Sequence, residues 1–270
     1  MSPDLSTIAM IAGNGIYPET FVKAARNAGV KKLVVAAFIN ETKPELAEIV
    51  DAIEWFRVGQ LSKMISFFVR HGAGQSVMVG QIAPKNLFDL RPDLRLLMML
   101  ARLKRRNAET LFGAISDEMA KDGIKLLPAT TFLEHLMPER GHVAGPAIKK
   151  RRWEDADYGF KIAKESSRLD IGQTVVVKNG TVLAVEAFEG TNEAVKRGGA
   201  MGRGGATMVK VAKPGQDMRF DVPVIGPDTV RTAADAGVDL IAVEAGMTLL
   251  LGLDELQQEC LQRKVSVIAL

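Results

Sequence analysis

The fold is decided by residues 7–18, which read Thr-Ile-Ala-Met-Ile-Ala-Gly-Asn-Gly-Ile-Tyr-Pro. Residues 7–12 form an apolar run of strand character, and Gly13-Asn14-Gly15 follows as a turn. Beyond the turn, apolar residues recur at helical spacing from Phe21 to Ala28. The order strand, glycine turn, helix is the opening unit of a doubly wound α/β sheet.

The same alternation continues through the first half of the chain. Further apolar runs predict strands at 33–39, 53–56, 75–80 and 124–127. Helical spacing is present over 60–71 and again in the segments that lead to Gly123. Strands that alternate with helices predict an N-terminal doubly wound, Rossmann-like parallel sheet with helices on both faces.

A change of composition at residues 136–152 predicts two domains. This stretch holds two prolines, two glycines and a basic run, which is typical of a linker. A length of 270 residues also suits two domains. We therefore expect an N-terminal nucleotide- or substrate-binding domain over 1–135 and a C-terminal domain over 153–270.

The second domain is predicted to be α/β with a mixed sheet. Its clearest signal is a hairpin over 174–185, because Asn179-Gly180 suits the positive φ angles of a type I′ turn. The remaining patterns predict helices at 153–167, 227–236 and 254–263, and strands at 207–211, 240–243 and 265–269.

Composition excludes several classes of protein. Cys260 is the single cysteine, so an internal disulfide and a thiolate metal site are both ruled out, and a reducing, cytoplasmic location is expected. No basic segment precedes an apolar run at the N-terminus, and no apolar run approaches the ~20 residues of a membrane span. A net charge of +3 with 6% aromatic residues gives no indication of nucleic-acid binding.

The chemistry is concentrated between residues 186 and 228. This segment contains five carboxylates together with Lys210 and several arginines; the acids are Glu186, Glu189, Asp217, Asp221 and Asp228. Carboxylates hold Mg²⁺, while Lys and Arg neutralise phosphate charge, so the set suits a magnesium-assisted reaction on a phosphate ester or anhydride. Asp217 and Asp221 lie four residues apart around Arg219, close enough to share a cation or a water.

Three segments that contain glycine leave alternatives open. Gly13-Asn14-Gly15 and Gly80-Gln81 each end a predicted strand on one sheet edge, and they are either tight turns or a site for a nucleotide or phosphate. Neither matches a dinucleotide fingerprint or a Walker loop. Residues 198–205 are either a flexible surface loop or a lid over a diphosphate.

The residues alone thus indicate a magnesium-assisted hydrolase or transferase acting on a phosphate-bearing ligand. A non-catalytic sensor of a nucleotide or nucleotide sugar, with a structural cation, is the alternative from another class. The incomplete glycine motif disfavours a nicotinamide-dependent oxidoreductase.

Three segments resemble the LpxI family, the UDP-2,3-diacylglucosamine pyrophosphatases of lipid A biosynthesis in Gram-negative bacteria. They are residues 12–18, 186–191 and 216–226, and the likeness keeps their order and spacing over essentially the whole chain. The resemblance implies magnesium-dependent hydrolysis of UDP-2,3-diacylglucosamine to UMP and 2,3-diacylglucosamine 1-phosphate (lipid X), with the substrate held between two domains.

The resemblance also assigns roles to residues. It implies Asp217, Asp221 and Lys210 as catalytic residues, and Asp217, Asp221 and Glu186 as metal ligands. The expected substrate-binding residues are Gly13, Asn14, Gly15, Gly80, Gln81, Glu189, Gly190, Thr191 and Arg219. Asn192 departs from the acid expected after Gly-Thr, which makes position 192 a poor metal ligand.

Residues 91–106 form a basic and strongly apolar block. It is either a half-buried amphipathic helix or a surface that touches anionic lipid or an acyl chain, and the second alternative suits peripheral contact with the inner membrane. We expect about half of its apolar residues to be buried. The sequence does not set the oligomeric state, for which a homodimer is the commonest choice in an enzyme of this size.

Overall fold

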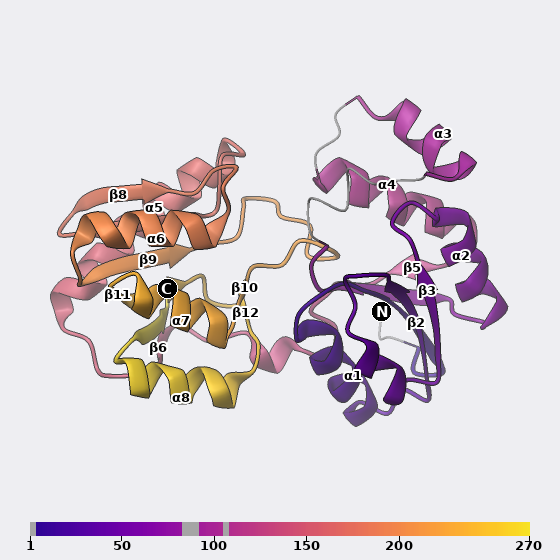
Figure 1. The fold of residues 1–270 in the computed structure, drawn as a ribbon, viewed down its shortest axis with the longest axis horizontal. Helices are drawn as coiled ribbons and strands as arrows, with labels where there is room; N and C mark the ends of the chain where they lie inside the picture. The colour runs from indigo at the N-terminus through magenta and orange to yellow at the C-terminus, as the bar shows by residue number, and fades with distance from the viewer. Residues whose placement is uncertain (1–3, 83–91, 105–107) are drawn as a thin grey trace. The chain divides into compact units, whose positions relative to one another are not determined.

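The structure is a computed structural model of the 270-residue chain and describes residues 4–82, 92–104 and 108–270 (Figure 1). The chain folds into two compact units, each with its own sheet. Unit 1 consists of Met1–Leu133 and Asp217–Asp221, and unit 2 consists of Glu134–Gln216 and Val222–Leu270.

Unit 1 contains the predicted parallel sheet. Its strand order is β3-β2-β1-β4-β5, and every neighbouring pair is parallel. The strands are β1 (Thr7–Ala12), β2 (Lys32–Phe38), β3 (Ala52–Phe56), β4 (Gln75–Val79) and β5 (Lys125–Leu126). The helices are α1 (Tyr17–Asn27), η1 (Pro44–Glu48), α2 (Leu61–Arg70), α3 (Leu94–Arg102) and α4 (Ala108–Lys121).

The central strand β1 is buried on both faces, which explains its continuous apolar sequence. Ala9 and Ile11 belong to the core cluster that α2 completes with Ile65. Ile8 and Met10 alternate to the opposite face and are also fully buried. The doubly wound fold predicted for the first domain is confirmed.

Unit 2 contains the predicted mixed sheet. Its order is β6-β13-β11-β9-β7-β8, in which β13, β11 and β9 are parallel and the outer pairings are antiparallel. The strands are β6 (Gly141–Ala144), β7 (Thr174–Lys178), β8 (Thr181–Val185), β9 (Ala206–Lys210), β11 (Val238–Val243) and β13 (Ser266–Ala269), with β10 (Val224–Ile225) and β12 (Leu249–Leu250) forming a separate parallel pair. The helices are η3 (Glu134–Leu136), α5 (Lys150–Arg168), α6 (Thr191–Gly202), α7 (Pro227–Asp235) and α8 (Leu253–Arg263).

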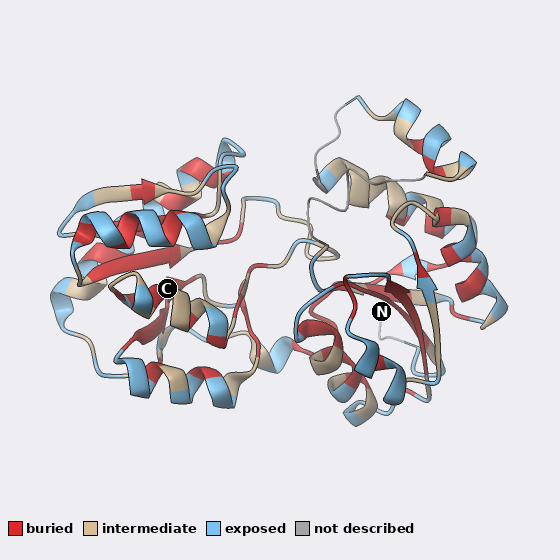
Figure 2. Cartoon of the chain, in the orientation of Figure 1, coloured by how far each residue is buried: buried red, intermediate tan, exposed pale blue. Residues whose placement is uncertain are grey.

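Alternating residues of the unit 2 strands build two cores. Val209 and Leu240 face α5, where they join Ala156. Met208 and Ile241 face the opposite side, in a cluster that includes residues of α6, α7 and α8. The sheet therefore lies between one helix and a layer of three, and its strands are largely buried in Figure 2. Asn179 and Gly180 both have positive φ, as the predicted hairpin turn requires.

Part of the segment expected as a linker, 136–152, is regular structure. Residues 141–144 form β6, which pairs antiparallel with β13, and α5 already begins at Lys150. β6 is a short strand at the edge of the sheet, where neighbouring prolines and glycines are tolerated. Its composition therefore resembles that of a loop.

Both interpretations of the glycine block at 198–205 are wrong for its first half. Residues 198–202 lie in the last turns of α6 and form neither a loop nor a lid. A Cβ on Gly198 would lie 2.5 Å from Cβ of Val176, and one on Gly199 would lie 2.1 Å from the carbonyl O of Ala236. These glycines allow α6 to pack closely on the sheet and on the end of α7. Among the described residues, no helix combines the length and apolarity needed to cross a bilayer.

Replacing Gly199 by alanine is expected to destabilise the protein by about 1–3 kcal/mol, the usual cost of overpacking. The backbone carbonyl of Ala236 cannot move aside as a flexible side chain would. Gly113→Ala is the matched control, because Gly113 is also helical and a Cβ there would meet nothing within 4 Å. That variant should gain about 0.5–1 kcal/mol from helix propensity. Urea unfolding measures both changes, and equal stability of the two variants would contradict the packing role.

Candidate functional site

The predicted site residues fall into three clusters in the structure. The glycine turns after β1 and β4 make the strand-end cluster, in unit 1. Residues 217–221 make the acidic segment, also assigned to unit 1. Glu186, Thr191 and Lys210 make the Lys210 cluster, in unit 2.

The strand-end cluster brings the two predicted glycine turns into direct contact. The backbone N–H of Asn14 donates to the carbonyl O of Gln81 (2.7 Å), and the N–H of Gln81 donates to the carbonyl O of Asn14 (3.3 Å). A Cβ on Gly13 would lie 2.7 Å from the Gln81 backbone, and one on Gly80 would lie 2.8 Å from the Asn14 carbonyl O. Close backbone approach is therefore a structural reason for both glycines.

The cluster also leaves exposed groups at the sheet edge. Asn14, Gly15, Gly80 and Gln81 are exposed beyond the carboxyl ends of β1 and β4. Ligands of open α/β sheets bind at this edge. The five residues expected to bind substrate here are thus neighbours, and their binding role stays a prediction.

The acidic segment is a turn closed by an ion pair. The backbone N–H of Asp221 donates to the carbonyl O of Asp217 (3.0 Å). The Arg219 side chain meets the Asp217 carboxylate side-on, with Nε 2.9 Å from Oδ1 and Nη2 2.6 Å from Oδ2. Residues 217–221 therefore form a helical turn and not an extended segment.

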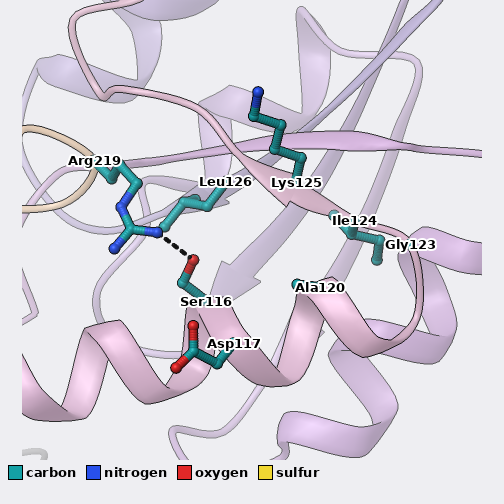
Figure 3. A pocket seen from close by; sticks show the side chains of 8 residues that line it. All are labelled: Ser116, Asp117, Ala120, Gly123, Ile124, Lys125, Leu126 and Arg219. Carbon is teal, nitrogen blue, oxygen red and sulfur yellow. Dashed lines mark hydrogen bonds between the residues drawn. The ribbon is translucent and has the colours of Figure 1, made fainter.

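Three further contacts attach the acidic segment to the rest of unit 1. Arg219 donates from Nη1 to Oγ of Ser116 (3.0 Å), as the dashed line in Figure 3 shows. The N–H of Ala129 donates to the carbonyl O of Met218 (2.8 Å). The rings of Phe220 and Phe112 lie 5.6 Å apart.

Arg219 lines an open pocket of about 380 Å³ beside α4 (Figure 3). The pocket presents two cationic residues and one acidic one; its other lining residues are Ser116, Asp117, Ala120, Gly123, Ile124, Lys125 and Leu126. Ser116 and Asp117 are polar groups that the sequence analysis did not find. They lie on a helix whose sequence carries no motif, and only the fold brings them to Arg219.

Electrostatics keep the Asp217–Arg219 pair charged. Hydrogen bonds from the Arg219 side chain hold the pKa of Asp217 below its ordinary value, against a smaller opposing effect of burial. The same bonds, followed by the charges of Asp217 and Asp117, raise the pKa of Arg219. Asp217 is therefore a carboxylate, and both of its oxygens accept hydrogen bonds from Arg219.

The Lys210 cluster is a hydrogen-bonded chain at the carboxyl end of β9. Nζ of Lys210 donates to Oγ1 of Thr191 (2.9 Å), and Oγ1 of Thr191 donates to Oε1 of Glu186 (2.8 Å). Oε2 of Glu186 is buried and has no hydrogen-bond partner within the described parts of the chain. A buried carboxylate oxygen without a donor is costly, and a ligand or cation would compensate that cost.

Glu189 and Gly190 lie at the start of α6, next to this cluster. Gly190 is the N-cap residue and has a φ of 84°. Oε1 of Glu189 accepts from Arg197 (2.6 Å), and Oε2 accepts from the N–H of Ala187 (3.1 Å). Glu189 thus orders the turn into the helix, and its backbone N–H together with Arg197 lowers the pKa of its carboxyl.

An ion pair between Lys164 and Glu244, which no sequence motif indicates, holds the chain just after Lys210. Nζ of Lys164 lies 3.0 Å from both carboxylate oxygens of Glu244 and donates to the carbonyl O of Ala212 (2.8 Å). Oε2 of Glu244 also accepts from the N–H of Ala212 (2.8 Å). The two residues are 80 positions apart, so no local pattern could reveal the pair.

The predicted metal ligands belong to two different clusters. Asp217 and Asp221 are in the acidic segment of unit 1, whereas Glu186 is in the Lys210 cluster of unit 2. Over residues 4–82, 92–104 and 108–270, no three His, Cys, Asp or Glu side chains gather as a ready-made metal site.

Comparison with known proteins gives matches over both halves of the chain. The model of the LpxI N-terminal domain matches residues 7–136, and that of the LpxI C-terminal domain matches residues 139–268. The UDP-2,3-diacylglucosamine pyrophosphatase LpxI of Caulobacter vibrioides is 29% identical over 255 residues, which cover 90% of each chain. Among solved structures, the biotin carboxylase subunit of pyruvate carboxylase aligns at 12% identity over 67% of this chain and 38% of that one, with a TM-score of 0.27, which is too low to support an inference.

Removing the Arg219 side chain should raise the pKa of Asp217 toward its ordinary value. A carboxylate whose pKa is lowered by folding adds stability above its unfolded-state pKa, and that stability is lost as the pH falls through the lowered value. Carbon NMR titration of the Asp217 carboxyl in Arg219→Gln should therefore show a midpoint shifted to higher pH. Arg140→Gln, an exposed arginine elsewhere, should leave the midpoint unchanged. An unshifted midpoint in Arg219→Gln would disprove the coupling.

Proposed function

Because the chain belongs to the LpxI family, we propose that it hydrolyses the diphosphate of UDP-2,3-diacylglucosamine in lipid A biosynthesis. The observation that carries this proposal is the match of both family domains, supported by a relative of that activity aligned over 90% of each chain. Water adds to one phosphorus and one P–O bond of the anhydride breaks. The products are UMP and 2,3-diacylglucosamine 1-phosphate, and the reaction belongs in the cytoplasm.

The described side chains supply the groups this reaction needs. A diphosphate carries negative charge that grows on the leaving phosphate as the bond breaks, so cationic donors stabilise the transition state. Lys210 and Arg219 are such donors, and we assign Lys210 to the reacting phosphates. Asp217, kept ionised by Arg219, and Asp221, exposed one turn later, are the carboxylates that orient water or cation.

The donor set fits Mg²⁺ as the cofactor. Mg²⁺ takes one or two protein carboxylates and completes its octahedron with water and phosphate oxygens, so a ready-made cluster of three acids is not required. The buried, unpartnered Oε2 of Glu186 is a suitable ligand atom, and Asp217 and Asp221 offer two more carboxylates. When bound, Mg²⁺ neutralises phosphate charge. We propose these three acids as the candidates from which Mg²⁺ takes its one or two protein ligands.

The strand-end cluster is the proposed site for the nucleotide side of the substrate. Its exposed backbone groups and the Asn14 and Gln81 side chains lie where a doubly wound sheet binds nucleotides. Gly190 and Thr191, at the start of α6, are proposed to contact phosphate through the backbone at the N-terminus of this helix.

The decisive experiment is UMP release from UDP-2,3-diacylglucosamine with and without Mg²⁺. We expect UMP and lipid X in equal amounts, and loss of the reaction in a chelator with recovery on adding Mg²⁺. A sensor would instead return the ligand unchanged. Hydrolysis at the same rate in the chelator would remove Mg²⁺ from the proposal, and no hydrolysis under either condition would overturn the proposed function.

Asp217→Asn and Asp221→Asn are each expected to lower turnover by a factor on the order of 10²–10⁴, the range for losing a positioned acid–base or charge-stabilising group. UMP affinity and melting temperature should change much less. Asp228→Asn is the matched control, since the Asp228 side chain is 96% exposed and pairs with Arg231 in the same helix. Its turnover should match that of the wild type. Activity within about threefold of wild type in both test variants would exclude these acids from the mechanism.

A further inference from the structure

Helix α3 presents apolar side chains to solvent along one side. Leu94, Leu97 and Met98 are 71%, 49% and 51% exposed, and Ala101 is exposed as well. The spacing i, i+3, i+4, i+7 places all four on one face of the helix. The opposite face is buried through Leu96 and Met99, which join the core cluster completed by α2. We call the exposed face, Leu94, Leu97, Met98 and Ala101, the α3 stripe.

Of the leucines and methionines in the block, Leu96 and Met99 are buried, whereas Leu100 and Leu103 are partly buried and the others are exposed. About half are therefore at least partly buried, as expected. A helix that only closes the core needs one apolar face, and its outer face is ordinarily polar. Arg91, Arg105 and Arg106 of the same block lie outside the described residues, so the inference rests on residues 92–104.

The exposed charges within residues 92–104 are cationic. The Asp93 carboxylate caps the helix, accepting from the N–H groups of Leu96 (2.9 Å) and Ser62 (2.6 Å). Arg95 is held by Glu118 (2.9 Å) and Asp122 (2.6 Å). The exposed charged residues between 92 and 104 are Arg102 and Lys104, at the end of the helix that follows the stripe.

Exposed apolar side chains next to exposed basic ones favour a membrane surface over a second protein chain as the partner. A second copy of the chain would bring the same cations to the contact, and a stable interface needs roughly 20–30 residues a side, several times the four of the stripe. Large apolar side chains flanked by basic ones are instead the pattern of a helix that lies at a membrane surface.

We propose that the α3 stripe docks the protein on an anionic lipid bilayer. Leu94, Leu97 and Met98 enter the boundary between headgroups and acyl chains, and Arg102 and Lys104 contact anionic headgroups. The thioether of Met98 adapts readily to irregular lipid packing. The value of docking for catalysis rests on the proposed function, because a diacylated substrate resides in the bilayer that the stripe would contact.

Vesicle co-sedimentation of the full chain tests the proposal without substrate. Vesicles of phosphatidylcholine with phosphatidylglycerol should bind the wild-type protein, and the double variant Leu97→Gln with Met98→Gln should bind at least about tenfold less tightly, since two apolar insertions are lost. Leu261→Gln is the matched control, an exposed leucine (64%) on helix α8 of unit 2, and should bind as the wild type does. Both sets of side chains are exposed, so melting temperatures should be unchanged.

A second pair of variants tests how much the two basic residues contribute to vesicle binding. Arg102→Gln and Lys104→Gln should each weaken binding to anionic vesicles about fivefold, the effect of roughly one basic contact. Their binding to pure phosphatidylcholine should be unaffected, and added salt should reduce the difference between these variants and the wild type.

Several results would overturn the proposal. One is wild-type protein that stays in solution with anionic vesicles, and another is equal binding by the double variant and Leu261→Gln. A change from dimer to monomer in the double variant, without a change in vesicle binding, would assign the stripe to a second copy. Absence of UMP release would overturn the proposed hydrolysis and leave the vesicle result standing, so the two failures are distinguishable.

Discussion

The acidic segment is held in place by the side-on ion pair between Asp217 and Arg219. This pair closes a five-residue turn and, through Ser116, attaches it to unit 1, although the chain on either side of the turn belongs to unit 2. A bidentate arginine–carboxylate pair has a fixed geometry, which a lysine could not supply. Just upstream, Lys164 and Glu244 hold the backbone at Ala212. Charged groups thus hold the chain in place within unit 2 at Ala212 and within unit 1 at the acidic segment.

The sheets were predictable from the sequence because their signals are local. The apolar runs and the Asn179-Gly180 turn specify strands and a hairpin through periodicity and backbone conformation alone. The glycines of α6 were misread for a physical reason. In the sequence, the run containing Gly198 and Gly199 resembles a flexible loop. In the structure these glycines allow close packing against Val176 and Ala236, which only the fold brings near them.

The candidate site was predictable to the extent that its residues follow strand ends. Lys210 ends β9 and Glu186 follows β8, so the topology places them together with Thr191. Ser116 lies more than 100 positions from Arg219, and Lys164 lies 80 from Glu244. Ion pairs and hydrogen bonds between such distant residues leave no periodic trace in a single sequence.

The assignment of Asp217–Asp221 to unit 1 has a consequence for modularity. A fragment that ends at Leu133 would carry the first sheet without the acids, and a fragment that begins at Glu134 would carry the acids without the helix that supports Arg219. Neither half is a self-contained building block that recombination could exchange with another protein. Substitutions in α4 and in the acidic segment therefore constrain one another, because Arg219 and Ser116 are hydrogen-bonded.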